Sequence, residues 1–394
     1  MSGLSRRTLS LLGVTVLAAA LAIYALQSGN GRLEDEFEPR LMFPELATRG
    51  DDVARIVVSA NKDQFEIERR DGAWLLPARD GFPASPNVVR NTILSLSRMQ
   101  LVERKTALAE RHQTIGLVAP AAGGDAVEIA LQDEAGSVLA ALLVGNVERG
   151  GGSGQDSTYF VRYPGDDQTW LARTTLQVED DVVDWLDRNI VSITRDEIQS
   201  VRISLPNAQP YRLERPSFDV TDFSLAEIPE GRTPMPAFTL NATAFALAGL
   251  SITDVKKVAD IEFSDPVKVS CRTFDGVLID IELVKSGEDR WMRLTATEAG
   301  ADQVSDQGSE LTADIEESAP QEPIGSETSD DESATEDAVL ASANEDAGLS
   351  ARIAALNQRV SGWAFQIPAF KYDQLAKPLE DLLEPLDETG GSAP

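Results

Sequence analysis

Residues 53–76 read VARIVVSANKDQFEIERRDGAWLL, and this stretch decides the class of fold. Apolar and polar residues alternate along it in two runs, which is the pattern of two half-buried strands. An Asp-Gly pair at positions 71–72 then signals a tight turn into a third apolar run. The stretch therefore predicts a small antiparallel meander, in which Ile56 shares a face with Val58 and Phe65 shares one with Ile67.

The next element along the chain is a helix. Ser85 is placed to cap it and Pro86 occupies its first turn, while Val89, Ile93 and Leu96 follow at helical spacing. Strand patterns then resume, and a short helix is predicted before the second half of the chain. The predicted strands are Val127–Leu131, Val138–Val144, Tyr159–Arg162 and Trp170–Leu171, and the predicted helix is Gln177–Arg188.

The same order of patterns then recurs. Phe65-Glu66-Ile67-Glu68-Arg69 is echoed by Tyr211-Arg212-Leu213-Glu214-Arg215. A period this long indicates a duplicated domain, because solenoid repeats are far shorter. We therefore predict an α+β fold made of a duplicated β-rich module, with antiparallel meanders that each pack a helix, over residues 53–190 and 191–295. The other matched pairs are the helices 86–99 and 241–250, the hairpins 133–144 and 274–283, and the strands 159–162 and 291–294.

A break in composition follows the second module. Residues 294–351 contain acidic side chains but no Lys or Arg, and they are rich in Ser, Ala, Gly and Thr. Such a segment buries too little apolar surface to offset the entropy of ordering, so we predict a disordered acidic insertion over residues 296–348. Apolar patterns return in residues 349–388, which we predict to dock on the second module as a helix, a strand and a helix.

The N-terminal region carries an apolar run. Leu9–Leu26 contains no charge, Arg6 and Arg7 precede it, and acidic residues follow it. Basic residues stay on the cytoplasmic side, so we predict a cytoplasmic N-terminus over residues 1–8, a transmembrane anchor over 9–26 and a stalk over 27–52. A cleaved signal peptide is the alternative interpretation. Both interpretations place the folded part outside the cytoplasm.

The charge and cysteine content exclude several classes of protein. With 65 acidic and 35 basic residues the net charge is −30, which disfavours nucleic acid as a partner. Cys271 is the only cysteine, so no intramolecular disulfide can form. It stands in the strand pattern Val267–Thr273, where a small buried side chain is the expected role.

Residues that could carry chemistry are few, and the sequence favours a protein that is not an enzyme. His112 is the only histidine, and it stands in a polar connector. The Gly-rich run 150–154 lacks the Lys and the helix of a phosphate-binding loop. Asp180, Asp184 and Asp187 share one face of the predicted helix, where a solvated face is favoured over a cation site. We therefore predict no catalytic residue, no cofactor and no metal site, although a pair of acids for glycoside hydrolysis stays open.

Several motifs follow one another in a distinctive order and spacing. They are Trp74-Leu75-Leu76-Pro77, the helix to Leu101, Ile115-Gly116-Leu117 with Pro120, Leu143-Val144-Gly145, Tyr159-Phe160-Val161-Arg162, Trp185-Leu186-Asp187-Arg188 and Gly362-Trp363 to Asp373. In this order they resemble the bacterial domain-of-unknown-function family 4340. The resemblance implies a membrane-anchored envelope protein, and some relatives are linked with ABC-type export systems, including those of the gliding-motility type. The family has no established catalytic residues to carry over.

The expected function is that of a non-catalytic, membrane-anchored periplasmic accessory or scaffold. Its expected partner is an inner-membrane protein such as an ABC permease, and its expected place is the bacterial inner membrane, with one span and the folded domains in the periplasm. One alternative is a module that binds an envelope polymer or peptide through exposed aromatic residues. A second alternative is a carboxylate-based hydrolase. The candidate aromatic residues are Tyr159, Tyr163, Trp170 and Trp291.

Overall fold

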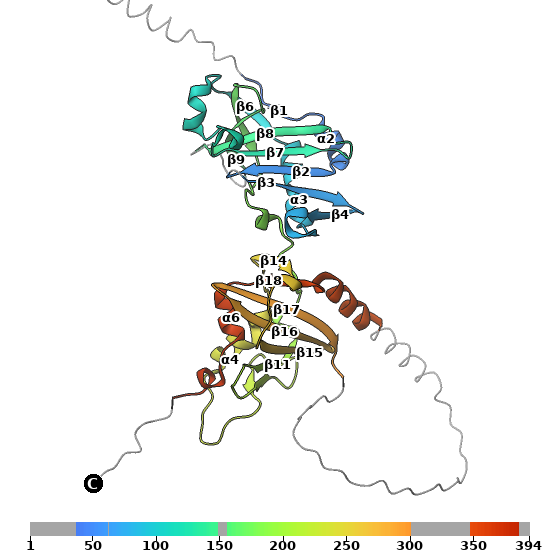
Figure 1. Ribbon diagram of the computed structural model, residues 1–394, viewed down its shortest axis with the longest axis vertical. Coiled ribbons are helices and arrows are strands. Elements are labelled where there is room, and N and C mark those ends of the chain that lie inside the picture. Colours follow the sequence, from blue (N-terminus) through green and yellow to red (C-terminus); the bar gives the residue numbers. More distant parts are fainter. Residues whose placement is uncertain (1–36, 62, 149–155, 301–346, 386–394) are drawn as a thin grey trace, which may run out of the picture. The chain divides into compact units, whose positions relative to one another are not determined.

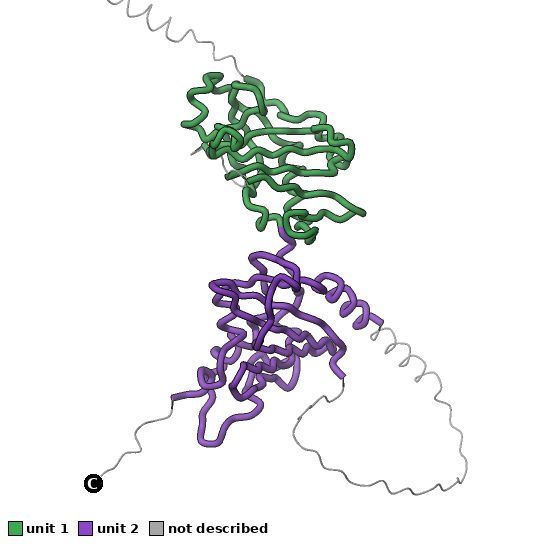
Figure 2. Tube along the Cα trace, in the orientation of Figure 1, with its two compact units in different colours: residues 1–185 green, residues 186–394 purple. Residues whose placement is uncertain are grey.

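The computed structural model describes residues 37–61, 63–148, 156–300 and 347–385. The chain divides into two compact units, the first ending at Trp185 and the second beginning at Leu186 (Figure 2). Among the described residues no helix is long and apolar enough to cross a membrane. The predicted anchor at residues 9–26 and most of the predicted acidic insertion lie outside the described residues.

The first unit is built on an antiparallel sheet of ten strands, which run in the order β1-β6-β10-β9-β8-β7-β2-β3-β4-β5 (Figure 1). The meander predicted from residues 53–76 forms its β2, β3 and β4. Its strands are β1 (Arg40–Leu41), β2 (Arg55–Ala60), β3 (Asp63–Arg70), β4 (Ala73–Leu76), β5 (Phe82–Pro83), β6 (Gln100–Arg104), β7 (Val127–Gln132), β8 (Val138–Val147), β9 (Ser157–Arg162) and β10 (Thr169–Thr174).

One longer helix, α3 (Pro86–Ser97), supports this sheet. The Ser85 hydroxyl accepts a hydrogen bond from the Val88 amide at 3.5 Å, and Pro86 stands in the first turn as predicted. Val89 and Leu96 lie on the same face of the helix, because residues seven apart stand two turns from each other. Both side chains are fully buried. The opposite face of α3 stays accessible.

Residues 40–52 do not form a stalk, and here the structure corrects the sequence analysis. Strand β1 pairs with β6, and α2 (Leu46–Arg49) and the 3₁₀ turn η1 (Gly50–Asp52) follow it. Met42, Phe43 and Leu46 are buried, and their burial holds this segment on the first unit. In the sequence this apolar stretch is short and is flanked on both sides by charged residues.

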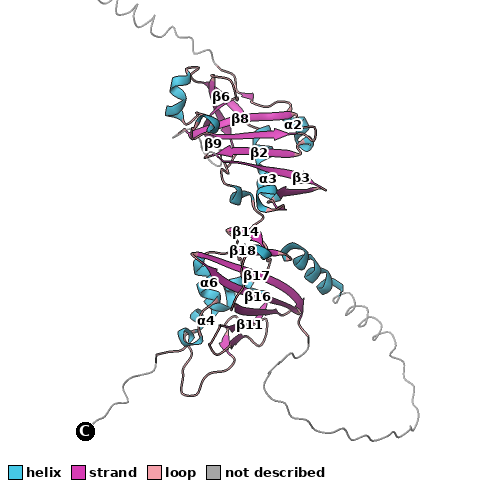
Figure 3. Cartoon of the chain, in the orientation of Figure 1, coloured by secondary structure: helices cyan, strands magenta, loops and turns pink. Residues whose placement is uncertain are grey.

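The second unit is built on an antiparallel sheet of eight strands, in the order β13-β12-β11-β15-β16-β17-β18-β14. The mixture of two antiparallel sheets with few helices confirms the α+β class (Figure 3). The strands are β11 (Ile198–Ser204), β12 (Tyr211–Glu214), β13 (Ser224–Leu225), β14 (Asp254–Lys257), β15 (Val267–Thr273), β16 (Val277–Ser286), β17 (Asp289–Glu298) and β18 (Trp363–Gln366).

Helices α4 (Ala237–Ala244) and α6 (Ala369–Leu375) pack against each other in this unit. A 3₁₀ turn, η7 (Phe245–Leu247), extends α4, so the helix predicted over 241–250 begins and ends earlier than expected. Residues 347–360 are also helical, and Asn357 of this helix exchanges two hydrogen bonds with the backbone of Ala296.

The C-terminal segment is more deeply integrated than the expected docking. Strand β18 lies between β17 and β14, so it is an inner strand of the second sheet. Its Phe365 and Ala364 have no exposed surface. The last helix predicted in residues 349–388 was expected over Tyr372–Leu386 with an interruption at Pro378. The structure has α6 followed by the 3₁₀ turn η9 (Leu379–Leu382), and the two are separated at Pro378, which cannot continue a helix.

The helix predicted over Gln177–Arg188 is also wrong. Only Val182–Trp185 form a 3₁₀ turn, and the residues before them have no regular secondary structure. Long-range hydrogen bonds hold this path, since Asn61 donates to the Asp180 carboxylate at 3.3 Å. Tertiary contacts, and not the local periodicity of the sequence, therefore determine the conformation of this segment.

The two sheets have the same order of connections. When β2, β3 and β4 are matched with β11, β12 and β13, the remaining strands β7, β8, β9, β10 and β6 match β15, β16, β17, β18 and β14. In both units the helix follows the meander and precedes the next strand along the sequence. The first sheet differs only by its additional edge strands β1 and β5.

A small second core covers the outer face of each sheet. In the first unit Leu117 and Leu143 are buried together with Phe160 beside them. In the second unit Val284 and Trp291 form the corresponding cluster, with Phe263 packed on it. In both units the covering loop is the one that leaves the strand after the helix, β6 or β14.

Candidate binding site

The single histidine is a structural residue in this fold. His112 is 4% exposed, and its Nε2 lies 3.0 Å from the Asp167 carbonyl oxygen. The ring therefore ties the connector after β6 to the turn between β9 and β10. This contact provides no nucleophile to activate, because its partner is a backbone carbonyl.

Cys271 is equally inaccessible. It has no exposed surface on β15, and burial raises the pKa of its thiol to about 12. A thiol with so high a pKa is protonated at neutral pH and is a poor nucleophile. Its position in a core strand agrees with the role expected from the sequence.

The three aspartates of the predicted helix do not meet on one helix face, because that helix is absent. Asp180 accepts a hydrogen bond from Asn61, while Asp187 forms an ion pair with Arg359 at 3.8 Å. In the described part of the chain no cluster of three or more His, Cys, Asp or Glu side chains is arranged to hold a metal ion. The Gly-rich run 150–154 lies outside the described residues.

The candidate aromatic residues contribute to packing. Trp291 is buried, Trp170 packs on Phe37 with ring centroids 5.3 Å apart, and the Tyr163 hydroxyl donates to the Met42 carbonyl. Tyr159 donates to the Leu176 carbonyl at 3.3 Å. Among the residues that the structure describes, the exposed aromatic side chains are others, namely Phe218, Phe238 and Phe370 of the second unit.

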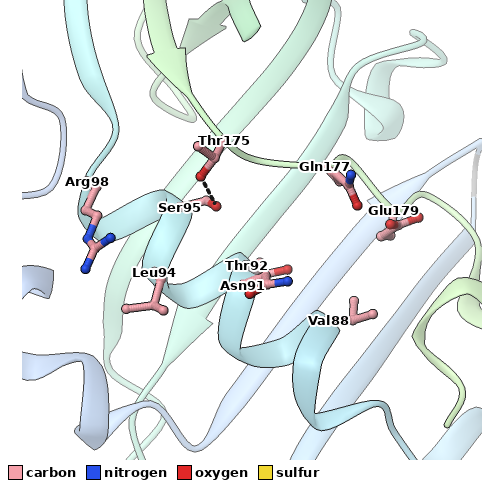
Figure 4. A pocket seen from close by; sticks show the side chains of 9 residues that line it. All are labelled: Val88, Asn91, Thr92, Leu94, Ser95, Arg98, Thr175, Gln177 and Glu179. Carbon is pink, nitrogen blue, oxygen red and sulfur yellow. Dashed lines mark hydrogen bonds between the residues drawn. The ribbon is translucent and has the colours of Figure 1, made fainter. Parts of the chain in front are cut away.

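A pocket of about 590 Å³ opens beside α3 in the first unit (Figure 4). One wall is the accessible face of α3, and the other is the segment that leaves β10. Neither wall was singled out by the sequence, because the lining residues are ordinary polar and apolar side chains and the two walls are far apart in the chain. The lining residues are Val88, Asn91, Thr92, Leu94, Ser95, Arg98, Thr175, Gln177 and Glu179.

Two hydroxyl contacts join the walls at the floor of this pocket. Ser95 Oγ and Thr175 Oγ1 lie 2.9 Å apart, as the dashed line in Figure 4 marks. Thr174 Oγ1 donates to the Ser95 carbonyl at 3.2 Å, which satisfies a carbonyl near the helix end. These contacts are partly or fully buried, so they fix the separation of the two walls.

Further contacts hold the second wall in place. The Leu176 amide donates to Thr174 Oγ1, and the Leu176 carbonyl accepts from Tyr159. Trp185 Nε1 donates to the Glu179 carbonyl at 3.2 Å. Because both walls are held by side-chain hydrogen bonds, the pocket is formed before any ligand arrives.

The polar groups of the pocket are arranged along its length. Figure 4 shows Arg98 at one end of the helix wall, and Gln177 with Glu179 toward the other end, near Val88. Asn91 and Thr92 lie between them on α3. The pocket therefore carries a basic side chain and an acidic side chain at its two ends, with amide and hydroxyl groups between them.

A second pocket, of about 360 Å³, lies on the outer face of the second sheet. Asp280 and Glu282 line it from one face of β16, and Trp363 lines it from β18. Both carboxylates have partners, because Ser270 donates to Asp280 at 2.5 Å and Arg293 donates to Glu282 at 2.6 Å. These two hydrogen bonds join neighbouring strands of the second sheet, β15 to β16 through Asp280 and β16 to β17 through Glu282.

Both units thus belong to one class, a β-rich module with an open antiparallel sheet and a covering helix. Residues 74–266 match the family model described as Domain of unknown function (DUF4340), so this part of the chain belongs to that family. The match begins in β4 and ends before β15, so it includes parts of both units. No curated protein and no solved structure shows significant similarity to the chain.

Proposed function

We propose that the protein is a non-catalytic, membrane-anchored accessory of the bacterial envelope that acts by binding. The observation that carries this proposal is that the reactive side chains of the protein are buried or already hold hydrogen-bond partners within the fold. His112 and Cys271 are buried in structural roles, and the carboxylates of the second pocket already have partners. The pocket beside α3, by contrast, is open and preformed.

The two units are, in this proposal, copies of one duplicated module. The shared order of strand connections supports this duplication. Equivalent buried positions on the two helices support it as well. Val89, Thr92 and Leu96 in the first unit correspond to Leu240, Thr243 and Leu247 in the second, each pair separated by the same number of residues. All six side chains are buried.

The anchor and the partner complete the proposal. The apolar run 9–26, with Arg6 and Arg7 before it, supports a single span with the folded units in the periplasm. The family resemblance favours an inner-membrane partner such as an ABC permease. A protein held at the membrane by one span would present its two modules to such a partner or to its cargo.

Crosslinking in intact cells, followed by mild solubilisation and mass spectrometry, tests this function. We expect the full-length protein to carry a recurrent integral membrane protein with it. A matched control replaces residues 9–26 by an unrelated single-span helix, which keeps the anchor but removes its sequence. Recovery of the protein alone under every condition would contradict the proposed function.

A carboxylate-based hydrolase is the second candidate, because Asp280 and Glu282 line one pocket. They stand two residues apart on a strand, and their Cα atoms are therefore about 7 Å apart. This function predicts that Asp280→Asn and Glu282→Gln each abolish turnover of an envelope glycan. Equal release of glycan fragments by the unchanged protein and by both variants would contradict the hydrolase function.

A further inference from the structure

The inference starts from an arginine that the two units hold at corresponding positions. Ile67 of β3 pairs with a buried residue of β2, and Leu213 of β12 pairs with a buried residue of β11. Arg69 stands two residues after Ile67, and Arg215 stands two residues after Leu213. The register of the strands therefore makes the two arginines equivalent.

These two arginines share three kinds of contact. The main-chain amide donates to a carbonyl near the start of the first strand, the guanidinium donates to the carbonyl of an aspartate in the 3₁₀ turn before that strand, and the guanidinium lies over an aromatic ring. The partners, in this order, are Ala54, Asp51 and Trp74 for Arg69, and Gln199, Asp196 and Phe223 for Arg215.

The second unit uses its arginine to hold a loop. Residues 215–223 connect β12 to β13, and Arg215 also donates to the carbonyl of Val220 in this loop at 3.0 Å. Two further carbonyls accept from the same guanidinium, and the ring centroid of Phe274 lies 5.1 Å from it. Arg215 is 2% exposed, so its own chain surrounds it and takes up its donors.

The first unit has a two-residue turn in place of this loop. Asp71 and Gly72 connect β3 to β4, and Arg69 stays partly exposed. Its Nη1 donates to the Asp51 carbonyl at 3.0 Å, whereas its Nε and Nη2 have no acceptor in the part of the chain that the structure describes. These two nitrogens form the edge that a guanidinium offers to both oxygens of a carboxylate.

Arg69 lines a pocket of about 470 Å³ between α2, α3 and the turn from β3 to β4. This pocket shares only Leu94 with the one in Figure 4, so the two lie on different sides of α3. Arg90 lines it from α3, is exposed, and forms no hydrogen bond or ion pair with any described residue. Trp74, Ile93 and Leu94 give it an apolar wall.

We propose that this pocket, the Arg69 pocket, binds a carboxylate that carries an aromatic or branched apolar group. Arg69 and Arg90 hold the carboxylate, and the apolar wall contacts the other part of the ligand. The charged residues of the lining are these two arginines and Asp51, which give it a net charge of +1. This charge suits a monoanion better than a doubly charged phosphate. The proposal requires neither the membrane anchor nor an inner-membrane partner, so it stands apart from the proposed function.

Isothermal titration of the purified full-length protein in neutral detergent, with 3-phenylpropanoate as the ligand and empty micelles as the blank, tests the proposal. We expect saturable binding with a Kd below about 5 mM, and affinities at least about fivefold lower for 3-phenylpropanamide and for acetate. The amide keeps the apolar group without the charge, and acetate keeps the charge without the apolar group. Absence of saturable binding, equal affinity for either analogue, or tighter binding of inorganic phosphate would overturn the proposal.

A free acid and the last residue of a peptide share this chemistry, and acetyl-alanyl-phenylalanine distinguishes the two sources. Tighter binding of this peptide than of 3-phenylpropanoate would support the proposal with a peptide carboxyl terminus as the ligand. Weaker but saturable binding of the peptide would support it with a free acid.

Variants assign the binding to the Arg69 pocket. Arg69→Met should weaken binding of 3-phenylpropanoate at least about fivefold and should nearly remove the preference for the acid over its amide. Arg70→Met is the matched control, because Arg70 is the next residue, forms an ion pair with Glu68 and does not line the pocket. It should change neither the affinity nor the preference. A preference for the acid that persists in Arg69→Met would overturn the assignment.

Arg90→Met tests the second guanidinium at an exposed position, where a change in folding is not expected. It should weaken binding of 3-phenylpropanoate about threefold with an unchanged melting temperature. An affinity equal to that of the unchanged protein would overturn the part of the proposal in which two arginines share the carboxylate.

Discussion

The grooves along α3 and α4 border on sheets with the same order of connections, yet one groove is open and the other is filled. In the second module α6 covers α4 and buries Tyr372 and Leu375. In the first module a segment without regular secondary structure, held by hydrogen bonds of Thr174 and Trp185, leaves one face of α3 accessible. The connections of a sheet thus determine where a groove lies, and the segment that follows the last strand determines whether the groove can take a ligand.

The largest effect is expected at an arginine that each module places near the end of its second strand, Arg69 within β3 and Arg215 directly after β12. Arg215 is 2% exposed and donates to the carbonyls of Ile198, Val220, Arg195 and Asp196, whereas Arg69 makes one backbone contact, to Asp51. Arg215→Met should lower the free energy of unfolding by about 3 kcal/mol, since it leaves buried carbonyls without donors. Arg69→Met should cost less than about 1 kcal/mol.

Urea unfolding, with hydrogen exchange of peptides from each module, measures both changes. The exchange data assign the loss to the second module. Equal destabilisation by the two substitutions would mean that the arginines play the same role, and that this part of the comparison is wrong.

The next largest effect concerns the helix that fills the second groove. Leu375 has no exposed surface, so Leu375→Ala should destabilise the second module by about 3 kcal/mol through lost burial and the cavity left behind. Phe370→Ala on the same helix is the control, because Phe370 is 61% exposed and its loss should cost less than about 0.5 kcal/mol. If Leu375→Ala had no larger effect than its control, α6 would not be an integral cover of α4.

A smaller effect is expected at the floor of the open groove. Ser95→Ala removes the hydroxyl that faces Thr175, and it should cost about 1 kcal/mol and increase hydrogen exchange at residues 174–179. The control is Ser59→Ala, which alters an exposed hydroxyl of β2. Unchanged exchange at these residues in Ser95→Ala would show that the pocket wall does not depend on this contact.

The smallest effect is a pH dependence confined to the second module. Although partial burial of Glu197 opposes ionisation, hydrogen bonds from Thr194 and the charge of Arg352 hold the pKa of its carboxyl below the ordinary value of 4.5. A lowered pKa contributes stability that is present above this value and is lost as the pH falls through the pKa of the folded state. Glu197→Gln should therefore be less stable than the unchanged protein at pH 7, by less than about 1 kcal/mol.

This difference should shrink as the pH is lowered from 5 to about 3, because the unchanged protein then also loses its carboxylate. Thermal unfolding of both proteins across this range measures it. A difference that stays constant with pH would mean that the charge of Glu197 does not contribute. Arg352 belongs to the helix over residues 347–360, so the experiment also tests how that helix is held.

The strands were the most predictable part of the fold, because their alternation is local. The echo between Phe65–Arg69 and Tyr211–Arg215 falls on β3 and β12, which occupy the same place in the two sheets. The segments 40–52 and 177–188 were predicted wrongly for a common reason. Their conformation depends on partners far away in the chain, such as β6 for β1 and Asn61 for Asp180.

The candidate site was not predictable in the same way. Thr92 and Ser95 interrupt the apolar stripe of α3, and this was the only local signal of a polar face. The other wall comes from residues 175–179, about eighty positions later, and no periodicity links the two. His112 and the three aspartates were candidates because of their residue types. In the structure His112 is buried in a structural contact, and the three aspartates do not share a helix face.

The position of β18 also has a consequence for the order in which the protein assembles. The first sheet has all its strands once Thr174 has been synthesised, whereas the second needs Trp363–Gln366 to join β17 to β14. Contacts between such distant residues form slowly, and unpaired strand edges are open to wrong partners while they wait. The first module can therefore complete its sheet early, and the second remains vulnerable to misassembly until nearly the whole chain is available.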